Sequence, residues 1–166
     1  MMTASLSPHS LLNAEERAAI AEIEATTNIL KLVTKLTNMQ FAGICKFTDS
    51  EWVTCSVYDP SNLGIESDVT LPLDSTLCSE IYKSSEALFI PEISKIECYS
   101  VRPVVKQYGL ESYAGVPIFL PDGRLYGTLC VCDSQSVFFE DPDLRESLGL
   151  FAKLIGCIFF ANLNHT

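Results

Sequence analysis

Residues 112–133 read SYAGVPIFLPDGRLYGTLCVCD, two apolar runs on either side of the turn sequence Pro121-Asp122-Gly123-Arg124. Proline presets the backbone φ of a turn, Asp122 can bond the local backbone, and Gly123 accepts a positive φ. The two runs are therefore predicted to be antiparallel strands. Both alternating faces are largely apolar, whereas an antiparallel pair usually leaves one face in water. We therefore predict a sheet covered on both faces, by helices on one side and by loops able to enclose a small molecule on the other.

Side chains alternate between the two faces of a strand, so the sequence also assigns each residue of the second run to a face. The two predicted sets are Leu125, Leu129 and Val131 on one face, and Tyr126, Cys130 and Cys132 on the other. Both sets are apolar enough to require cover from water.

The same segment resembles the GAF family of sensory domains, in which a strand like residues 113–118 leads through a DGR-like turn into a strand like residues 127–133. A second block, TxCxxI at residues 76–81 followed by ALFIPEI at residues 87–93, is similar to the helix and strand before the ligand-side loop in GAF domains of bacterial signalling kinases. The resemblance implies an α/β (α+β) fold. Its central antiparallel sheet has five to six strands, with the terminal helices on one face and short helices and loops on the other.

Length and composition fit one soluble domain. The chain has 166 residues and 48% hydrophobic content, enough to bury a single core. The predicted organisation is a disordered lead over residues 1–12, a single GAF-like domain over residues 13–163 and a tail over residues 164–166. Because GAF domains act in larger sensors, the resemblance also implies an output domain or signalling partner, as in two-component systems.

Charge argues against two classes of partner. The chain has 11 basic and 21 acidic residues, a net charge of −10, and its few basic residues are scattered. Binding to nucleic acid or anionic lipid relies on clustered Lys and Arg, so neither is expected. No unbroken apolar run reaches the roughly 20 residues that cross a bilayer, and the N-terminus lacks the pattern of a signal peptide. We therefore expect a cytoplasmic protein that binds no membrane.

A first helix is predicted over Asn13–Met39, with Asn13 as its N-cap. Apolar residues recur along it at steps of three and four, which is the helical spacing. They form two lines, Ala18, Ala21, Ala25, Ile29, Leu32, Leu36 and Met39 in the first and Ile20, Ile23, Thr27, Leu30 and Val33 in the second.

A last helix is predicted over Asp141–Leu163, because Asp141 and Pro142 suit the N-cap and first-turn positions. It too carries two apolar lines, Leu144, Leu148, Phe151, Ile155 and Ile158 in the first and Leu150, Leu154, Cys157 and Ala161 in the second. One helix packed on one sheet explains one line. The surplus lines predict a homodimer through the Asn13–Met39 and Asp141–Leu163 helices.

Between these helices the pattern predicts a hairpin over residues 40–58, a short helix over residues 75–83 and a strand over residues 87–90. Residues 91–111 are the least regular stretch, with one or two helical turns ended by Gly109. Binding function tends to lie in such irregular segments, so we expect the ligand site there.

The cysteines do not indicate a metal site or a disulfide scaffold. Seven is an odd number, most of them fall within strand or helix patterns, and the closest pair is Cys130-x-Cys132. The two histidines, His9 and His165, lie in the tails, which disfavours a Ser-His or Cys-His catalytic pair. We therefore expect mostly reduced, buried thiols, no metal ligands and no catalytic residues.

The predicted ligand-binding residues combine thiols, aromatic rings and cations around the loop-side cavity, a mixture suited to a small, planar, anionic ligand. They are Cys78, Cys98, Tyr99, Arg102, Lys106, Tyr108 and Tyr113. The sequence does not identify a cofactor. Cyclic nucleotides are disfavoured because the chain lacks a glycine-rich phosphate cradle and the Asn-Lys-Phe-Asp signature of nucleotide-binding GAF domains.

Three functions follow from the resemblance. The first is a regulatory domain that binds a small molecule or senses redox state. The second is a bilin photosensor attached at Cys98, although Tyr99 stands where those proteins usually have histidine. The third is a thiol-dependent reductase of free methionine sulfoxide using Cys78 and Cys98. A further alternative is a dimerisation module with a vestigial pocket filled by Phe89, Phe119 and Tyr126.

Overall fold

The computed structural model describes residues 11–163, so residues 1–10 of the predicted lead and the predicted tail lie outside the described residues. Within residues 11–163, six strands form one antiparallel sheet in the order β3-β2-β1-β6-β5-β4. The strands are β1 (Phe41–Phe47), β2 (Glu51–Tyr58), β3 (Thr70–Pro72), β4 (Leu88–Ile90), β5 (Ser112–Phe119) and β6 (Leu125–Asp133). The sheet confirms the predicted α/β class and the predicted strand number.

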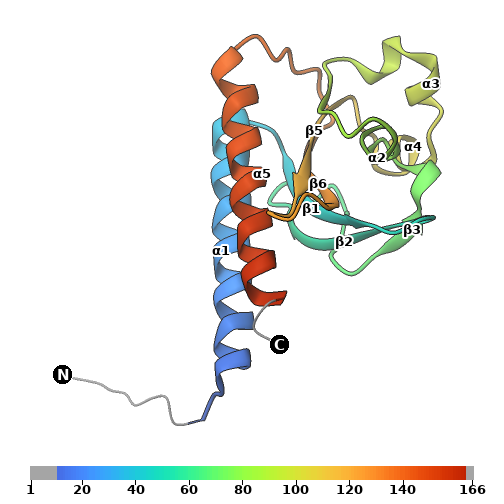
Figure 1. The fold of residues 1–166 in the computed structure, drawn as a ribbon. Coiled ribbons are helices and arrows are strands. Elements are labelled where there is room, and N and C mark those ends of the chain that lie inside the picture. Colours follow the sequence, from blue (N-terminus) through green and yellow to red (C-terminus); the bar gives the residue numbers. More distant parts are fainter. Residues whose placement is uncertain (1–10, 164–166) are drawn as a thin grey trace.

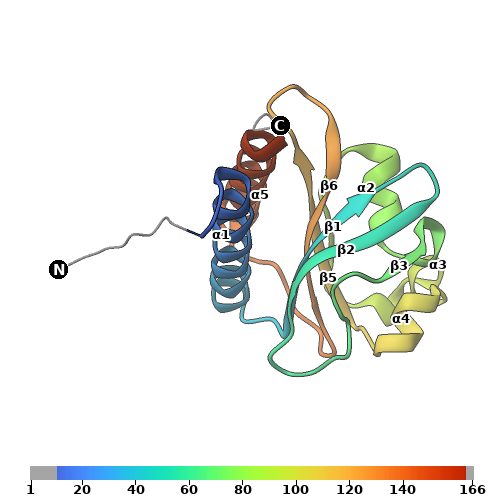
Figure 2. The same cartoon turned by 90° about the horizontal axis from the view of Figure 1, so that it is seen from below.

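Helices cover both faces of this sheet, so the molecule has three layers (Figure 2). The two long helices, α1 (Ala14–Thr37) and α5 (Pro142–Leu163), lie side by side and antiparallel on one face (Figure 1). Short elements cover the other face, namely α2 (Cys78–Ser84), α3 (Glu97–Ser100), α4 (Pro103–Tyr108) and the 3₁₀ turns η2 (Leu73–Ser75) and η3 (Ile93–Lys95). This is the predicted arrangement of layers.

Each face of the sheet has its own core. The helix-side core lies against α1 and α5 and consists of Ile29, Leu30, Val33, Met39, Ala42, Ile44, Ala114, Val116, Ile118, Leu120, Leu129, Val131, Leu148, Ala152, Ile155 and Phe159. The loop-side core consists of Phe41, Cys45, Phe47, Trp52, Ile65, Leu73, Leu77, Cys78, Ile81, Ile90, Ile93, Val104, Val105, Leu110, Tyr113, Cys130 and Cys132.

A capping box starts α1 at the predicted residue. The side chain of Asn13 accepts a hydrogen bond from the Glu16 N–H at 2.7 Å, and Glu16 accepts one from the Asn13 N–H at 3.1 Å. The helix ends at Thr37 because Asn38 adopts a left-handed conformation with φ 56°. It therefore stops two residues before the predicted end at Met39.

The two predicted apolar lines of α1 do not match its buried face. Each line mixes buried residues with exposed ones: Ile29 is buried but Leu32 and Leu36 are exposed, and Leu30 is buried but Ile20 is exposed. The buried face of α1 carries Thr26, Ile29, Leu30, Val33, Thr34 and Thr37. The periodicity predicted the helix correctly but not its buried face. Because α1 packs against both β2 and α5, the buried face lies between the two predicted lines.

The apolar lines of α5 match the structure more closely. Leu148 and Ile155 in the first line are buried, whereas Leu150 and Leu154 in the second are 56% and 53% exposed. Because α5 packs against β5 and α1 with its first line, the second line faces away from the sheet.

By length and composition α5 also meets the requirements of a membrane-crossing helix, with a mean hydropathy of 1.5 over an 18-residue window. The prediction from unbroken apolar runs did not detect this. A core helix of a folded domain meets the same requirements, and α5 contributes Leu148, Ala152, Ile155 and Phe159 to the helix-side core.

The turn at residues 121–124 forms as predicted. The Leu120 N–H donates to the Arg124 carbonyl and the Gly123 N–H donates to the Leu120 carbonyl, each at 2.8 Å, and Gly123 has φ 92°. Asp122 accepts a hydrogen bond from the Arg124 N–H at 3.1 Å. These bonds hold β5 and β6 as one hairpin.

The predicted faces of β6 fail at its first two residues. Leu125 packs on the loop-side core and Tyr126 on the helix-side core, the reverse of the prediction. The register with β5 shifts between Ile118 and Phe119. One residue step along β5 there corresponds to two residue steps along β6. Gly127 follows the shift, and a Cβ there would collide with the Cys45 carbonyl oxygen of β1.

The other predicted elements are present. β1 and β2 form the predicted hairpin, and α4 ends at Gly109, which has φ 65°. The helix predicted over residues 75–83 is shorter, because a 3₁₀ turn precedes it and α2 begins at Cys78. These short elements bring residues 73–110 over the loop-side face of the sheet.

Candidate functional site

A small cavity of about 20 Å³ lies within the loop-side core, between the sheet and the α2 and α4 segments. It is far smaller than the several hundred Å³ of typical drug-sized ligand sites. Its wall contains no charged side chain: it consists of Phe41, Trp52, Ile65, Thr76, Leu77, Cys78, Val104, Leu110, Tyr113, Cys130 and Cys132. The site is therefore an apolar chamber with a few neutral polar groups.

Two of those neutral groups bond to each other, and a third group outside the wall bonds to one of them. The Cys78 thiol at the start of α2 shares a hydrogen bond with the Tyr113 hydroxyl of β5 at 3.0 Å. The Thr128 hydroxyl of β6 donates to the Cys78 sulfur at 3.4 Å. These bonds join α2 to both strands of the β5–β6 hairpin, so α2 and the sheet are linked through Cys78.

Burial keeps these groups neutral. It raises the pKa of Cys78 from the usual 9.0 to about 12, with a smaller contribution from a hydrogen bond with Cys130. Burial raises the pKa of Cys45 and of Tyr113 well above their ordinary values as well, and neighbouring thiols add to both effects. A thiolate is the reactive form of cysteine, so Cys78 is inert as a nucleophile near neutral pH.

The close approach of α2 to the sheet depends on Gly115. A Cβ at this residue of β5 would collide with the Tyr113 hydroxyl and would lie 2.6 Å from Cδ1 of Ile81 in α2. The absence of a side chain lets the Tyr113 ring lie along its own strand and lets Ile81 reach the strand surface. Gly115 therefore sets the spacing on which the Cys78 and Tyr113 contact depends.

Trp52 supplies a polar atom of a different kind. This residue of β2 lines the cavity and is only 4% exposed. Its Nε1 is the one buried side-chain nitrogen or oxygen that lacks a hydrogen-bond partner among the described residues. Buried donors nearly always have an acceptor, so this indole N–H requires an explanation.

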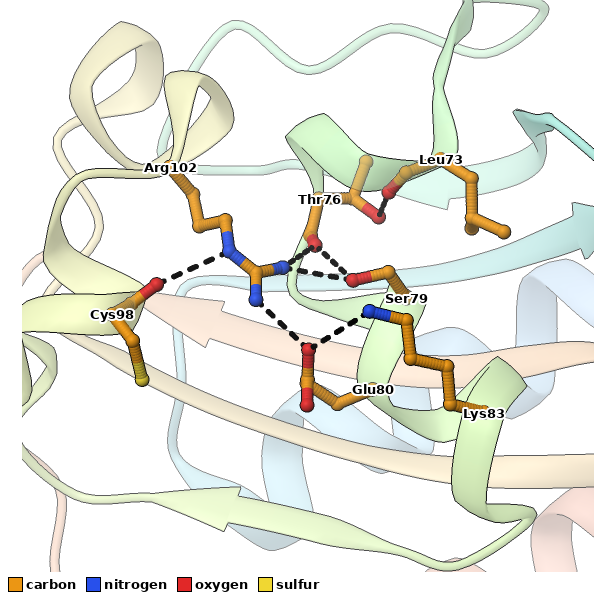
Figure 3. Close-up of polar contacts among 7 residues, drawn as sticks. All are labelled: Leu73, Thr76, Ser79, Glu80, Lys83, Cys98 and Arg102. Atoms are coloured by element: carbon orange, nitrogen blue, oxygen red, sulfur yellow. Dashed lines mark hydrogen bonds and ion pairs between the residues drawn. The ribbon is translucent and has the colours of Figure 1, made fainter.

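Arg102 fastens the cover of the cavity (Figure 3). From the residue before α4 its guanidinium donates to the Thr76 carbonyl at 2.6 Å, to the Ser79 hydroxyl at 2.8 Å and to the Glu80 carboxylate at 2.8 Å. It also donates to the Cys98 carbonyl of α3 at 3.2 Å. We call these bonds the Arg102 clamp, because they hold the α3 and α4 segment against α2.

The structure brings two of the seven predicted site residues, Cys78 and Tyr113, to the cavity wall. Tyr99 and Tyr108 are half-buried beside the loop-side core but outside the wall. Neither predicted cation lines the cavity. Arg102 forms the clamp, and Lys106 is exposed, as is Cys98.

Several wall residues were missed by the sequence reasoning. Trp52, Phe41 and Leu77 were given no role, although the alternation along β1 and β2 places Phe41 and Trp52 on one face. The residues predicted to fill a vestigial pocket are also elsewhere. Phe89 and Tyr126 pack on the helix-side core, and Phe119 is 41% exposed, so the chamber is filled by other side chains.

The described residues offer no arrangement suited to a metal ion: within residues 11–163 no group of three or more His, Cys, Asp or Glu side chains is placed to hold one. The seven cysteines are all free thiols, four of them buried. The chamber therefore offers mainly van der Waals contact to a guest.

Comparison with known families agrees with this architecture. The model of the GAF domain matches residues 22–158, which is most of the chain. The chain belongs to the GAF domain family. A search of curated proteins gives no significant match. GAF domains bind diverse small molecules, so membership gives the fold and the general class of the protein without its ligand.

Solved GAF structures show the same fold at low sequence identity. The blue-light-absorbing form of the PixJ GAF domain from Thermosynechococcus elongatus is 11% identical, with 94% of this chain and 95% of that chain covered and a TM-score of 0.67. The GAF domain of an Acinetobacter phosphoenolpyruvate-protein phosphotransferase is 14% identical, with 93% and 98% covered and a TM-score of 0.63. A type II free methionine-R-sulfoxide reductase from Thermoplasma acidophilum is 13% identical, with 85% and 94% covered and a TM-score of 0.67.

Proposed function

We propose that this GAF domain is a cytoplasmic regulatory module that binds a small molecule in the loop-side chamber. A change there is passed through the sheet to α1 and α5, which pair with a second copy and act on an output domain or signalling partner. The module has no catalytic role in this proposal. Cys78 and Tyr113 are the predicted ligand-binding residues that the chamber supports best.

The observation that carries this proposal is that β5 and β6 serve both cores. On β5, Tyr113 faces the chamber while its neighbour Ala114 packs in the helix-side core. On β6, Cys130 and Cys132 face the chamber while Val131 between them faces the helices. A guest that shifts either strand must therefore shift the surface on which α5 rests.

The contact between α5 and the sheet is tight enough to follow such a shift. A Cβ at Gly156 of α5 would collide with the backbone carbonyl of Phe119 in β5, so the two backbones are nearly in contact. Packed interiors transmit displacement because they contain few voids. A ligand changes helix packing only through its different affinity for two arrangements of the domain.

The outer surface of the helix pair supports association between copies. Leu32 and Leu36 of α1 and Leu150 and Leu154 of α5 are each more than half exposed. Contiguous exposed apolar side chains of this size are typical of interaction surfaces. The homodimer through the two terminal helices therefore remains our proposal for the mode of association.

Replacing Leu154 by glutamate tests the dimer. We expect wild-type protein to sediment as a dimer at micromolar concentration and Leu154→Glu to sediment as a monomer, because the charge would be buried against the partner. Lys153→Glu is the matched control, since it also adds an acidic group on the surface of α5 but removes no apolar contact. A wild-type monomer, or equal dissociation in both variants, would remove the dimer from the proposal.

Native mass spectrometry tests the ligand. Protein purified from its own host under gentle conditions is expected to carry a bound mass that Leu77→Trp, a substitution that fills the chamber, releases. Circular dichroism must show that this variant is folded. Wild-type protein without any bound mass, after extracts of that host have been added back, would contradict a ligand-binding role.

The burial of Cys78 argues against this thiol as the nucleophile of the reductase alternative. Its chemistry needs a thiolate, and burial raises the pKa of Cys78 to about 12, which leaves roughly one thiol in 10⁵ ionised at pH 7. Turnover of free methionine sulfoxide with dithiothreitol as the reductant measures the activity directly. Turnover that Cys78→Ser abolishes would overturn this conclusion.

Attachment of a bilin at Cys98 is favoured by one observation, the exposure of this thiol on α3 in the segment that covers the chamber. A tetrapyrrole is much larger than a cavity of about 20 Å³, so the α3 and α4 segment would have to move away from the sheet. Coexpression with bilin-producing enzymes tests this second candidate. A coloured product that shows zinc fluorescence in a denaturing gel, and loses it in Cys98→Ala, would establish it.

A further inference from the structure

A second, larger cavity lies between α5 and the end of β5. Its volume of about 400 Å³ falls in the range of small-molecule sites, unlike that of the loop-side chamber. It is open to solvent, because Phe119 of β5 and Lys153 of α5 both line it and are both exposed. The two cavities share no wall residue, so this one is a separate candidate site.

The wall of this cavity is apolar apart from one cation. Residues of β5 and of the turn after it, among them Pro117, Phe119 and Pro121, form one side, and α5 forms the other with Gly149, Lys153 and Cys157. Proline fixes its own backbone φ, so the first side loses little conformational freedom when a guest binds. The cavity thus offers a largely preformed apolar surface with a single positive charge.

Gly149 leaves this cavity open at a cost to α5, because glycine is less stable than alanine in the interior of a helix. Packing requires the other glycine of α5, since a Cβ at Gly156 would collide with the Phe119 carbonyl. A Cβ at Gly149 would meet nothing within 4 Å. The packing of the domain therefore does not explain Gly149, whereas a guest that occupies the space beside it does.

Lys153 is the one charged residue among residues 147–163. Positions three and four residues away on the helix hold only leucine, glycine and cysteine, so α5 offers it no ion pair. No other carboxylate within residues 11–163 lies at ion-pair distance from it. Lysine lays its aliphatic stem on apolar surface and keeps its ammonium group in water, so the charge is expected at the mouth of the cavity.

We propose that this cavity binds a small carboxylic acid with an apolar body. The carboxylate pairs with the Lys153 ammonium at the mouth, and the body contacts Phe119 and the two prolines. This inference goes beyond the proposed function, because it concerns a site outside the loop-side chamber. The site also lies outside the proposed dimer surface, since neither Leu150 nor Leu154 belongs to its wall.

Three molecules separate the contributions of charge and apolar body on the full chain. Phenylbutyrate has both, phenylbutyramide keeps the shape without the charge, and butyrate keeps the charge without the ring. Binding is read from backbone amide NMR shifts of Phe119, Gly149 and Cys157. Alkylation of the exposed thiols gives an independent measure of location, because a guest in this cavity should slow modification of Cys157 and not of Cys98.

We expect phenylbutyrate to bind wild-type protein roughly fivefold more tightly than the amide at low salt, the upper value for an exposed ion pair. Added salt should reduce this ratio. Butyrate should bind roughly tenfold more weakly than phenylbutyrate, because it lacks the ring. Lys153→Met keeps an aliphatic stem and should bring the ratio of acid to amide close to one. Lys35→Met removes an exposed lysine of α1 outside the cavity and is the control that leaves the ratio unchanged.

A second variant tests the location of the guest. Gly149→Leu places an aliphatic side chain in the open space and replaces glycine with a better helix former, so the protein should fold. It is expected to weaken phenylbutyrate binding roughly tenfold or more, because the apolar body loses its place against the wall. Circular dichroism shows whether both α5 variants keep the fold.

Equal affinity of acid and amide for wild-type protein would overturn the inference, as would the absence of phenylbutyrate binding. Amide shifts confined to Leu77 and Val104 of the chamber wall would also overturn it, because they would place the guest in the chamber. If Gly149→Leu dissociates a dimer but leaves phenylbutyrate affinity unchanged, a second copy fills the cavity and the inference fails. Ligand binding in the chamber, which Leu77→Trp tests, stands or falls separately from each of these results.

Discussion

The two faces of the sheet are covered by different kinds of structure and filled by different kinds of residue. The helix-side core is aliphatic apart from Met39 and Phe159 and contains no cysteine, tryptophan or tyrosine among its fully buried members. The loop-side core contains four cysteines, Trp52 and Tyr113. Two helices of 24 and 22 residues cover the first, whereas helices of four to seven residues cover the second.

This difference indicates that the covers on the two faces of the sheet differ in stability. Long helices that bury aliphatic side chains give a stable support that opens only with global unfolding. Short helices joined by loops have few internal hydrogen bonds, so the cover of the chamber can open locally at lower cost. The domain thus places a stable pair of helices and a more easily opened cover on opposite faces of β5 and β6.

Matched truncation of two fully buried isoleucines gives the largest expected contrast. Ile155→Ala in the helix-side core is expected to lower the free energy of unfolding by about 4 kcal/mol, near the upper part of the range for such substitutions. Ile81→Ala on α2 should cost about 2 kcal/mol, because the short elements around it can collapse into the space. Urea unfolding measures both, and an Ile81→Ala cost equal to or above that of Ile155→Ala would contradict the comparison.

A methyl group at Gly115 tests how closely α2 must approach the sheet. Gly115→Ala is expected to cost about 1–3 kcal/mol, because the new Cβ collides with the Tyr113 hydroxyl and crowds Ile81. Gly149→Ala in α5 is the control, since a Cβ there meets nothing within 4 Å and the helix should gain about 0.5–1 kcal/mol. Thermal unfolding in which both variants shift in the same direction would show that Gly115 does not set this spacing.

The buried thiols predict a loss of stability in alkali. Below pH 9 the Cys78 thiol is protonated in the folded and unfolded states alike. Between pH 9 and about 12 the unfolded state has lost this proton and the folded state has kept it, so rising pH favours unfolding by about 1.4 kcal/mol per pH unit.

Urea unfolding midpoints between pH 8 and 10.5, in the presence of a reductant, measure this slope. Cys78→Ala should flatten it, with the remaining slope due to the other groups whose pKa burial raises, among them Cys45, Tyr113 and Tyr126. An identical slope in wild type and Cys78→Ala would mean that Cys78 is not shielded from solvent in the folded state.

Local chemistry explains which parts of the fold were predictable. The Pro-Asp-Gly-Arg turn and the Asn13 N-cap form from residues within a few positions of one another, and both were predicted correctly. The reversed faces of Leu125 and Tyr126 arise where Gly127 meets Cys45, a residue about 80 positions earlier in the chain. The alternation of apolar side chains along a strand, which has a period of two residues, gives no sign of such a shift.

The candidate site was less predictable because its residues come from distant segments. Composition placed Arg102 near the site, but its role depends on partners 22 to 26 residues away, in α2 and just before it. Trp52 lies in β2, which β1 separates from the β5–β6 hairpin in the sheet. The sequence of that hairpin therefore gives no indication that Trp52 belongs to the chamber wall. Chemistry in a short segment can be predicted from sequence, but the grouping of side chains from six helices and strands cannot.

The outermost strands of the sheet are short. They are β3 and β4, of three residues each, and β3 includes Pro72, which has no backbone N–H to offer an incoming strand. Short edge strands, and a proline within one of them, discourage the edge-to-edge strand pairing that leads to fibrils. Copies of this domain are therefore less prone to polymerise by pairing at these edges when their concentration is high.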